Sequence, residues 1–279
     1  MELIEKKNAY IINQDLIKSL YFDDNLSIIE ISKKLNLNSN TLSVFIKNKW
    51  GRKTLSKSCT KYNFDENIFD NIDIEWKAYF LGWMITDGNL YKKAKKNTIS
   101  LCITESDKYI LDYFNCKIFD CKKPLNYRKA RLKKGTEYLC KPLWRFQIDS
   151  QKLIEKFEKL GIVENKSLIV EFPNYLDKTL LRHFIRGVFE GDGSIGINRV
   201  EPNKCIKFFS ASILFINKLQ EILNTELNIT SKINKKENKE NPLYILTFSK
   251  KEDVLKFKEY IYKDCEMFLK RKYEKFNTK

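Results

Sequence analysis

The stretch "FLGWMITDGNL", residues 80–90, is an apolar run that ends in an aspartate followed by a glycine. A second stretch, "FIRGVFEGDGSIG" at residues 184–196, again carries an early glycine and closes on Asp-Gly. The two aspartates, Asp87 and Asp192, are 105 residues apart. One such run could be a core helix that happens to stop at Asp-Gly, whereas two runs indicate a duplicated unit.

The duplication continues beyond the two runs. "LWRFQIDSQKLIEKFEKLGI" at 143–162 parallels "LYILTFSKKEDVLKFKEYIY" at 243–262, and each reads as a strand followed by a helix. Alternating apolar side chains predict the buried side of each strand: Trp144, Phe146 and Ile148 in one copy, Tyr244, Leu246 and Phe248 in the other. The repeat predicts an α+β fold of two lobes related by a pseudo-twofold axis, each αββαββα. Lobe one would span 76–175 and lobe two 176–279.

The N-terminal segment has a different pattern, with three short runs of helical spacing separated by a break at residues 36–38. Their expected inward residues are Leu16, Ile17, Leu20, Ile28, Ile31, Leu35, Leu42, Phe45 and Ile46. A helix, a short turn and a second helix predict a helix-turn-helix. Residues 1–58 are therefore interpreted as a small all-α DNA-binding domain and 59–75 as a linker to the core at 76–279. The exposed side of the recognition helix would consist of Ser39, Asn40, Thr41, Ser43 and Lys47. A helical bundle used only for packing is the alternative.

Charge indicates the class of partner. The chain has 52 Lys and Arg against 36 Asp and Glu, a net charge of +16 over 279 residues. A folded protein this basic is expected to bind a polyanion, with nucleic acid favoured, because its cations displace counterions from phosphates. The alternative is that the lysines only keep the protein in solution. No run of about 18 apolar residues is present, so no membrane-spanning helix is expected.

The start of the chain lacks the apolar core of a secretory signal, so an intracellular protein is expected, in a bacterial or phage-host cytoplasm or an organelle. Seven scattered cysteines without a Cys-x-x-Cys pair fit reduced thiols better than a disulfide framework or a zinc site. The only histidine, His183, removes most histidine-based catalytic schemes and is interpreted as structural.

The paired motifs resemble those of the LAGLIDADG homing endonucleases. The nine-residue motif aligns with residues 80–88 and with residues 185–193, and the second copy is the closer match. The eighth position is Asp in both copies, whereas the acidic sixth position is Ile85 in the first. A helix-turn-helix ahead of such a core is similar to bacterial and phage-type members. The resemblance implies a site-specific endonuclease that makes metal-dependent double-strand breaks in DNA by phosphodiester hydrolysis, encoded by an intron or a free-standing mobile element rather than an intein.

Helix packing and helix-end electrostatics explain why the motif contains glycine and aspartate. Gly82 and Gly187 would let two helices approach closely, and the glycine after each aspartate would cap its helix. A carboxylate at a helix C-terminus faces the negative end of the dipole, which a divalent cation would offset. Asp87 and Asp192 are therefore expected side by side, with the main-chain oxygens of Thr86 and Gly191 as further ligands for two or more Mg²⁺ ions. Because one chain supplies both halves, a monomer without a protein partner is expected.

The family also carries a basic residue in each lobe near the scissile phosphate. "GIVENKSLI" at 161–169 corresponds to "MFLKRKYEK" at 267–275 by the repeat, which matches Lys166 with Lys272. Glu105 lies where the family often has a polar residue that orders water. The alternative for each lysine is an ordinary solvated charge.

Double-stranded DNA would lie along the sheet of each lobe, with the sheet in the major groove. The expected contacts in lobe one are Arg145 and Gln147 between the buried strand residues, Tyr91, Lys93, Thr98 and Ser100 on the first hairpin, and Arg128 and Arg131 near a hairpin tip. The alternative is a generic basic surface. A non-cleaving transcription regulator or intron maturase with the same fold is the second function. Because both aspartates remain, cleavage is favoured.

Overall fold

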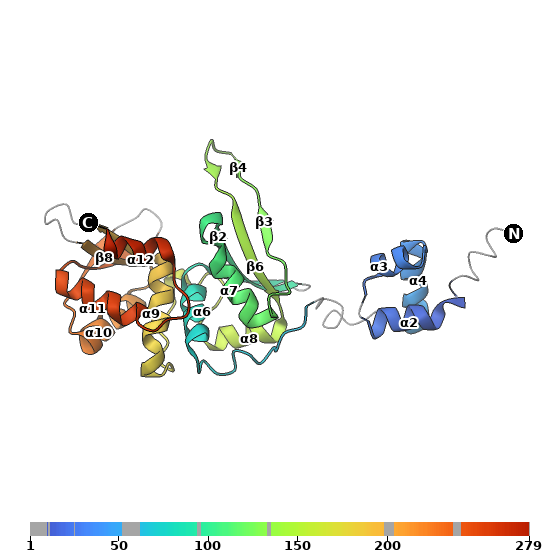
Figure 1. Cartoon of the computed structure of the whole chain (residues 1–279), viewed down its shortest axis with the longest axis horizontal. Coiled ribbons are helices and arrows are strands. Elements are labelled where there is room, and N and C mark those ends of the chain that lie inside the picture. The colour runs from blue at the N-terminus through green and yellow to red at the C-terminus, as the bar shows by residue number, and fades with distance from the viewer. Residues whose placement is uncertain are drawn as a thin grey trace. The chain divides into compact units, whose positions relative to one another are not determined.

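The computed structural model describes residues 10, 12–24, 26–51, 62–93, 96–132, 135–197, 204–236 and 241–278. It divides into two compact units, Met1–Asn63 and Phe64–Lys279. Figure 1 shows the elements of each unit.

The first unit contains α2 (Gln14–Phe22), α3 (Ile28–Lys34) and α4 (Ser39–Trp50). The three predicted helices and the break before α4 are confirmed. Ser27 and Glu30 form a capping box at the start of α3, and the Asn38 side chain accepts hydrogen bonds from the first turn of α4. Ile17, Leu20, Ile31, Leu42 and Ile46 are buried together with Tyr10 and Tyr21, and Ile28, Leu35 and Phe45 pack against them partly buried.

Leu16 is the exception among the predicted inward residues, because its side chain is 48% exposed. The buried stripe of α2 consists of Ile17, Leu20 and Tyr21, one helical turn apart. Tyr21 completes this stripe and Leu16 lies outside it, so the inward position predicted for Leu16 was wrong.

The second unit contains the two lobes, which repeat one order of elements. Lobe one runs α6 (Glu75–Thr86), β1 (Gly88–Lys93), β2 (Lys96–Thr104), α7 (Lys108–Phe119), β3 (Asn126–Arg128), β6 (Leu143–Asp149) and α8 (Gln151–Lys159). Lobe two runs α9 (Lys178–Asp192), β7 (Ser194–Ile197), β8 (Lys204–Ser210), α10 (Ile213–Leu227), β9 (Lys232–Lys236), β10 (Leu243–Phe248) and α11 (Lys251–Tyr262). The antiparallel sheets have equivalent strand orders, β1-β2-β6-β3 and β7-β8-β10-β9. The αββαββα prediction is therefore confirmed.

Each lobe also carries elements that the repeat did not predict. Lobe one has a short ribbon, β4 (Arg131–Leu132) paired with β5 (Leu139–Cys140), on the arm that rises from the sheet in Figure 1. It also has two 3₁₀ turns, η1 (Glu105–Asp107) and η2 (Lys166–Leu168). In lobe two the chain adds α12 (Lys270–Asn277) after α11.

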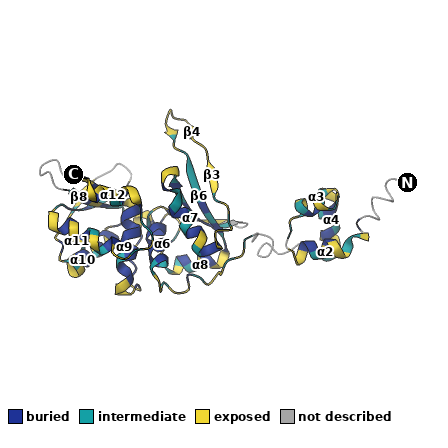
Figure 2. Ribbon diagram, in the orientation of Figure 1, coloured by how far each residue is buried: buried dark blue, intermediate teal, exposed yellow. Residues whose placement is uncertain are grey.

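Helices α6 and α9 pack side by side between the two sheets (Figure 1). They are buried over most of their length, the dark blue centre of Figure 2. Their contact depends on glycine. A Cβ added to Gly82 would lie 2.4 Å from the Phe184 oxygen, and one added to Gly187 would lie 2.4 Å from the Tyr79 oxygen. The predicted close approach is confirmed. Phe80 of α6 also packs on Phe69, Phe114 and Phe157 of lobe one, so α6 is covered by both α9 and the lobe one core.

The predicted linker, residues 59–75, has two parts. Residues 59–61 lie outside the described residues, whereas the chain from residue 64 packs with the core unit. Phe69 is fully buried, and its ring contacts those of Trp76, Phe80 and Phe157. The boundary between the compact units therefore falls at Asn63, ahead of the predicted start of the core.

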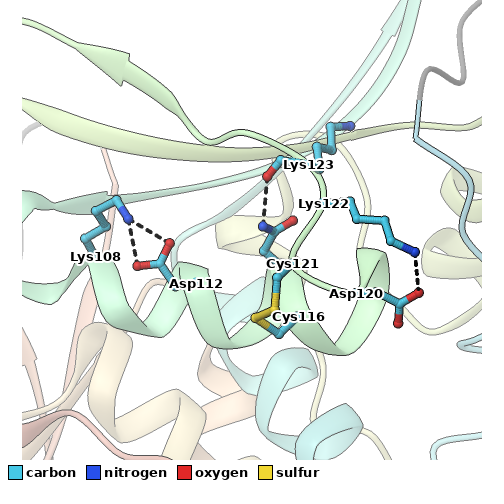
Figure 3. The surroundings of a disulfide bond; sticks show 8 residues. Lys108, Asp112, Cys116, Asp120, Cys121, Lys122 and Lys123 are labelled. Carbon is cyan, nitrogen blue, oxygen red and sulfur yellow. Dashed lines mark hydrogen bonds and ion pairs between the residues drawn. A yellow bond between two sulfur atoms is a disulfide. The ribbon is translucent and has the colours of Figure 1, made fainter.

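Cys116 and Cys121 form a disulfide at the end of α7 (Figure 3), so the expectation of wholly reduced thiols was wrong for this pair. The chain reverses there because Asp120 and Cys121 both have a left-handed backbone, which brings the two Cα atoms to 3.9 Å. The Asn115 side-chain amide also spans this reversal by donating to the Lys123 oxygen over 2.8 Å. Among the described residues, Cys102, Cys140, Cys205 and Cys265 are free thiols. None of the described helices is long and apolar enough to cross a membrane.

Candidate active site at the ends of the two central helices

The ends of α6 and α9 meet. A Cβ added to Gly191 would lie 2.0 Å from the Thr86 hydroxyl oxygen, so the last turns of the two helices are in direct contact. Asp87 follows α6 as its C-cap, and Asp192 is the last residue of α9. The geometry that two close-packed helices impose thus brings the two motif aspartates to one place.

The carboxylates of Asp87 and Asp192 are exposed to solvent but lie close to other protein groups. The side chains are exposed, yet the surrounding protein removes part of their hydration and raises the pKa of both groups. The pKa of Asp87 reaches about 6, because burial and the nearby Asp192 carboxylate both disfavour its charge. The ammonium groups of Lys272 and Lys166 act in the opposite direction.

The prediction that a glycine caps each helix is confirmed for Gly193, the C-cap of α9, whose amide donates to the Phe189 oxygen over 2.9 Å. It was wrong for Gly88, because Asp87 is the C-cap of α6 and Gly88 already begins β1. Both glycines are also needed for space. A Cβ on Gly88 would lie 2.4 Å from the Met84 oxygen, and one on Gly193 would lie 2.4 Å from the Phe189 oxygen. Each strand leaves its helix by folding back across the last turn, where only glycine fits.

Lys272 secures the end of α9. Its side chain comes from α12 and is 5% exposed. Nζ donates to the main-chain oxygens of Phe189 at 2.7 Å, Gly191 at 3.2 Å and Gly193 at 2.6 Å. Burial, followed by the Arg271 guanidinium, lowers the pKa of Lys272 to about 8. The lysine therefore remains mostly protonated at neutral pH.

Lys166 occupies the equivalent place in lobe one. It lies at the start of η2, is 8% exposed, and donates from Nζ to the Gly88 oxygen. Burial lowers its pKa, although Asp192 and Asp87 favour its charge. Gly88 and Gly193 are the ninth residues of the two motifs, so the structure brings the two lysines to matching oxygens. Their catalytic role stays a prediction.

Comparison with known proteins supports the resemblance that the motifs indicate. Residues 179–262 match the family model of the LAGLIDADG-like domain. The chain carries a LAGLIDADG-like domain. The fold is similar to that of the homing endonuclease I-WcaI bound to its DNA recognition sequence, with a TM-score of 0.50 and 18% identity over 88% of this chain and 96% of that one.

Two further similarities are weaker. The I-LtrWI LAGLIDADG homing endonuclease, bound to target DNA, is 14% identical with a TM-score of 0.43 over 72% of this chain and 87% of that one. The ATP-dependent DNA helicase Hel308 of Methanocaldococcus jannaschii is 32% identical over 166 residues, 58% of this chain. The match spans only 12% of the helicase.

The donor atoms at the LAGLIDADG helix ends fit a hard divalent cation. Two carboxylates and main-chain oxygens are the ligands that Mg²⁺ prefers, and a bound cation would offset both the burial and the Asp192 charge that raise the pKa of Asp87. Within the described ranges no three His, Cys, Asp or Glu side chains gather, so Asp87 and Asp192 would need main-chain oxygens to complete a metal site. The Gly191 oxygen, expected as a ligand, already accepts a hydrogen bond from Lys272.

The sixth LAGLIDADG position lies in the interior, away from the two aspartates. Glu190 is fully buried, accepts a hydrogen bond from the Tyr79 hydroxyl, and accepts another from the Leu269 amide over 2.8 Å. Ile85, its counterpart in α6, is 7% exposed. The departure from the family pattern at Ile85 therefore changes packing and leaves the pair of acids intact.

Two charged contacts of the core unit were missed from the sequence, one at the start of α6 and one beside Lys272. Arg186 is fully buried in α9 and donates to the Glu75 carboxylate over 2.8 Å, and one of its nitrogens lies 2.8 Å from His183 Nδ1. The presence of an arginine inside an apolar motif could have indicated a buried ion pair. Arg271, beside Lys272, joins the lobes by donating to the Asp107 carboxylate over 2.8 Å.

Lobe one presents most of its predicted DNA contacts on the face opposite α7 and α8. Cys102 pairs with Arg145, and Ser100 pairs with Gln147, which places these four side chains on that face. Arg145 and Gln147 are partly exposed. The remaining predicted contacts of the hairpins are exposed, namely Tyr91, Lys93, Arg128 and Arg131.

Thr98 and Ser100 are the exceptions, because they are only 6% and 4% exposed. Both point to the predicted face, yet they are short and lie between the longer side chains of β1 and β6. The Thr98 hydroxyl donates to the Asp149 carboxylate over 2.6 Å, and the Gln147 amide donates to the same oxygen over 2.9 Å. Thr98 therefore supports Asp149, and the predicted accessibility of both Thr98 and Ser100 was wrong.

In the first unit, the predicted recognition side of α4 is partly accessible. Asn40, Thr41 and Lys47 are exposed, whereas Ser39 and Ser43 are half-buried. The helices match the prediction, and DNA contact by this unit stays a prediction. Glu105 is exposed at the start of η1, and its water-ordering role is likewise untested.

Proposed function

We propose that this protein is a site-specific homing endonuclease that hydrolyses both strands of a DNA duplex, with Mg²⁺ held by Asp87 and Asp192. One observation carries the proposal: two aspartates at touching helix ends, each accompanied by a buried lysine from its own lobe on a matching oxygen. The similarity in fold to I-WcaI, solved with its DNA recognition sequence, and the net charge of +16 support a DNA substrate.

Each component of the site has a distinct task in this proposal. Asp87 and Asp192, with the main-chain oxygens of Thr86 and Gly191, supply the oxygen ligands. Bound Mg²⁺ would polarise the phosphate and lower the pKa of an attacking water. Lys166 and Lys272 hold the helix-end oxygens in place, and their positive charges favour the approach of a phosphate to two acids that would otherwise repel it.

The rest of the chain supplies recognition. The sheet of each lobe would lie in the major groove, and the helix-turn-helix would add contacts from α4. Because one chain holds both motifs, a single copy would bind one duplex without a protein partner.

The test replaces the acids by their neutral isosteres. A duplex bound and cut by the wild-type protein is first selected from a randomised library with Mg²⁺. Asp87→Asn and Asp192→Asn should each abolish double-strand cleavage of that duplex and keep sequence-specific binding. Asp120→Asn, a change of the same kind at an exposed helix end, is the control and should cut normally. Wild-type cutting by the Asp87→Asn, Asp192→Asn double variant would contradict the proposal.

A second function has one observation in its favour. The Lys272 ammonium already contacts the Gly191 oxygen that a metal ion would use. A LAGLIDADG protein in which that lysine replaced the metal would bind DNA without cutting it. It would act as a transcription regulator or an intron maturase. Specific binding without nicking or cleavage in Mg²⁺ or Mn²⁺ would select this function.

A further inference from the structure

The two sheets share one topology but differ in the chemistry of the face opposite their helices. In lobe one, α7 packs on β2 and β6, and in lobe two, α10 packs on β8 and β10. The strand register then identifies matching positions. Arg145 pairs with Cys102 and Asn126, and Ile245 pairs with Phe209 and Asn234.

The face of lobe one is built for hydrogen bonding. Arg145 and Gln147 stand at its centre, and neighbouring groups orient both of them. The Arg145 Nε lies 3.3 Å from the Cys102 sulfur, and the Asp149 carboxylate accepts from the Gln147 amide over 2.9 Å. An arginine and a glutamine held in this way present donors and acceptors in fixed directions.

At the matching positions of lobe two, the side chains do not provide this set of oriented hydrogen-bond donors and acceptors. Ile245 replaces Arg145, Phe209 replaces Cys102, and Thr247 replaces Gln147. Ile245 and Phe209 are directly opposite each other on neighbouring strands, and both remain partly exposed. The centre of this face is therefore an apolar pair open to solvent.

A basic border surrounds the apolar pair. Lys207 pairs with Thr247 on one side, and Lys232 pairs with it on the other. Lys236, opposite Leu243, extends the border along β9. All three lysines are exposed. An apolar centre between exposed cations fits a ligand that has methyl groups between rows of phosphate, which is the major groove of a duplex containing thymine.

We infer that lobe two recognises its half of the DNA target through thymine methyl groups packed on Phe209 and Ile245, whereas lobe one reads its half by hydrogen bonds. The inference rests on the proposed binding of DNA and extends it, because it assigns different chemistry to the two half-sites. A protein surface without acidic side chains fits the border less well, since the three exposed lysines would face it without anionic partners.

The experiment removes methyl groups one at a time. In the duplex selected from the randomised library, each thymine is replaced by deoxyuridine, which keeps every hydrogen-bonding group of the base and deletes only the methyl. Binding is measured for each duplex. Sensitive thymines should fall in one half-site, each costing about fourfold in affinity, as expected for one buried methyl-sized group.

Protein variants assign that half-site to lobe two. Ile245→Ala should remove the sensitivity to uracil at the position that Ile245 covers, and Phe209→Ala at the next, while Arg145→Ala should leave both sensitivities unchanged. Grafting the lobe one residues, as Ile245→Arg with Phe209→Cys, should replace a thymine preference by a preference for guanine.

The outcomes separate the inference from the proposal beneath it. If no duplex is recovered from the library, the proposed site-specific function fails. If a duplex is bound or cut but uracil is tolerated throughout, or the sensitivity persists in Ile245→Ala and Phe209→Ala, the assignment of lobe two to thymine methyl groups is overturned.

Discussion

At the scale of single residues, Lys272 resolves a problem that every helix end poses. The last carbonyls of a helix have no donors within the helix. In α9, Lys272 supplies donors for the oxygens of Phe189, Gly191 and Gly193 from outside the helix. Burial, followed by the Arg271 charge, lowers the pKa of Lys272, and the three oxygens supply the partners that a buried ammonium needs.

Replacement of Lys272 by methionine should therefore destabilise the fold as well as affect cleavage. Lys272→Met leaves buried acceptors unsatisfied and should reduce the free energy of unfolding by about 2 to 4 kcal/mol in urea denaturation. Lys166→Met, which frees one oxygen, should cost less. The control is Lys218→Met at an exposed pair with Glu221, expected within about 0.5 kcal/mol of wild type. Unchanged stability of Lys272→Met would show that its contacts are dispensable.

His183 makes the fold sensitive to acid. Burial, followed by the Arg186 and Arg182 charges, lowers its pKa from 6.5 to about 3 in the folded chain. Between these values only the unfolded chain takes up the proton, so this contribution to stability is complete above pH 6.5 and is lost as the pH falls toward 3. In wild type, the free energy of unfolding should fall by up to about 1.4 kcal/mol per pH unit from this group alone.

His183→Gln keeps a polar side chain beside Arg186 but cannot titrate. Urea denaturation between pH 7 and 5 should therefore give a shallower slope for the variant than for wild type. Parallel slopes for the two proteins would mean that His183 is protonated equally in both states.

At the scale of elements, the contact between α6 and α9 determines the site, because it fixes where the two helix ends meet. Gly187→Ala places a methyl group 2.4 Å from the Tyr79 oxygen, which has no room to move within a helix. The helices must separate, and we expect a loss of about 3 kcal/mol in the free energy of unfolding. Gly196→Ala is the matched control, because its Cβ meets nothing within 4 Å. Equal melting temperatures of the two variants would show that the helices are not held this closely.

The sequence predicted these elements unevenly. The repeat of Asp-Gly after a glycine-bearing apolar run was sufficient to predict the two helices and their approach. The match of Lys166 with Lys272 also required the family resemblance and the alignment of 161–169 with 267–275. Alternation gave the correct face for Thr98 but not its burial, since exposure depends on the length of neighbouring side chains across strands. The steric need for glycine at position 88 could not be predicted either. It arises because β1 folds back over the last turn of α6, and not from local backbone preference.

At the scale of the whole molecule, the chain consists of two units with separate apolar cores. Both motif aspartates and both lysines belong to Phe64–Lys279, and the predicted helix-turn-helix belongs to Met1–Asn63. Deleting residues 1–63 should therefore weaken binding to the selected duplex and reduce the slope of log affinity against log salt, since fewer phosphates are contacted. Cleavage should persist at high protein concentration.

Filter binding over a range of salt concentrations and a cleavage titration, both on the truncated protein, measure the two effects. Circular dichroism confirms that it is folded. A folded truncated protein that cuts at no concentration, while the full chain cuts, would show that the first unit takes part in catalysis.

The two lysines differ in the number of main-chain oxygens that they bind, and this difference bears on the order in which the two DNA strands would be cut. Lys272 holds three oxygens at its helix end, whereas Lys166 holds one at the matching position. If each half of the site cuts one strand, helix ends held by different numbers of hydrogen bonds should cut their strands at different rates. A double-strand break would then be the end of an ordered pair of events, and a duplex nicked on one known strand would exist between them.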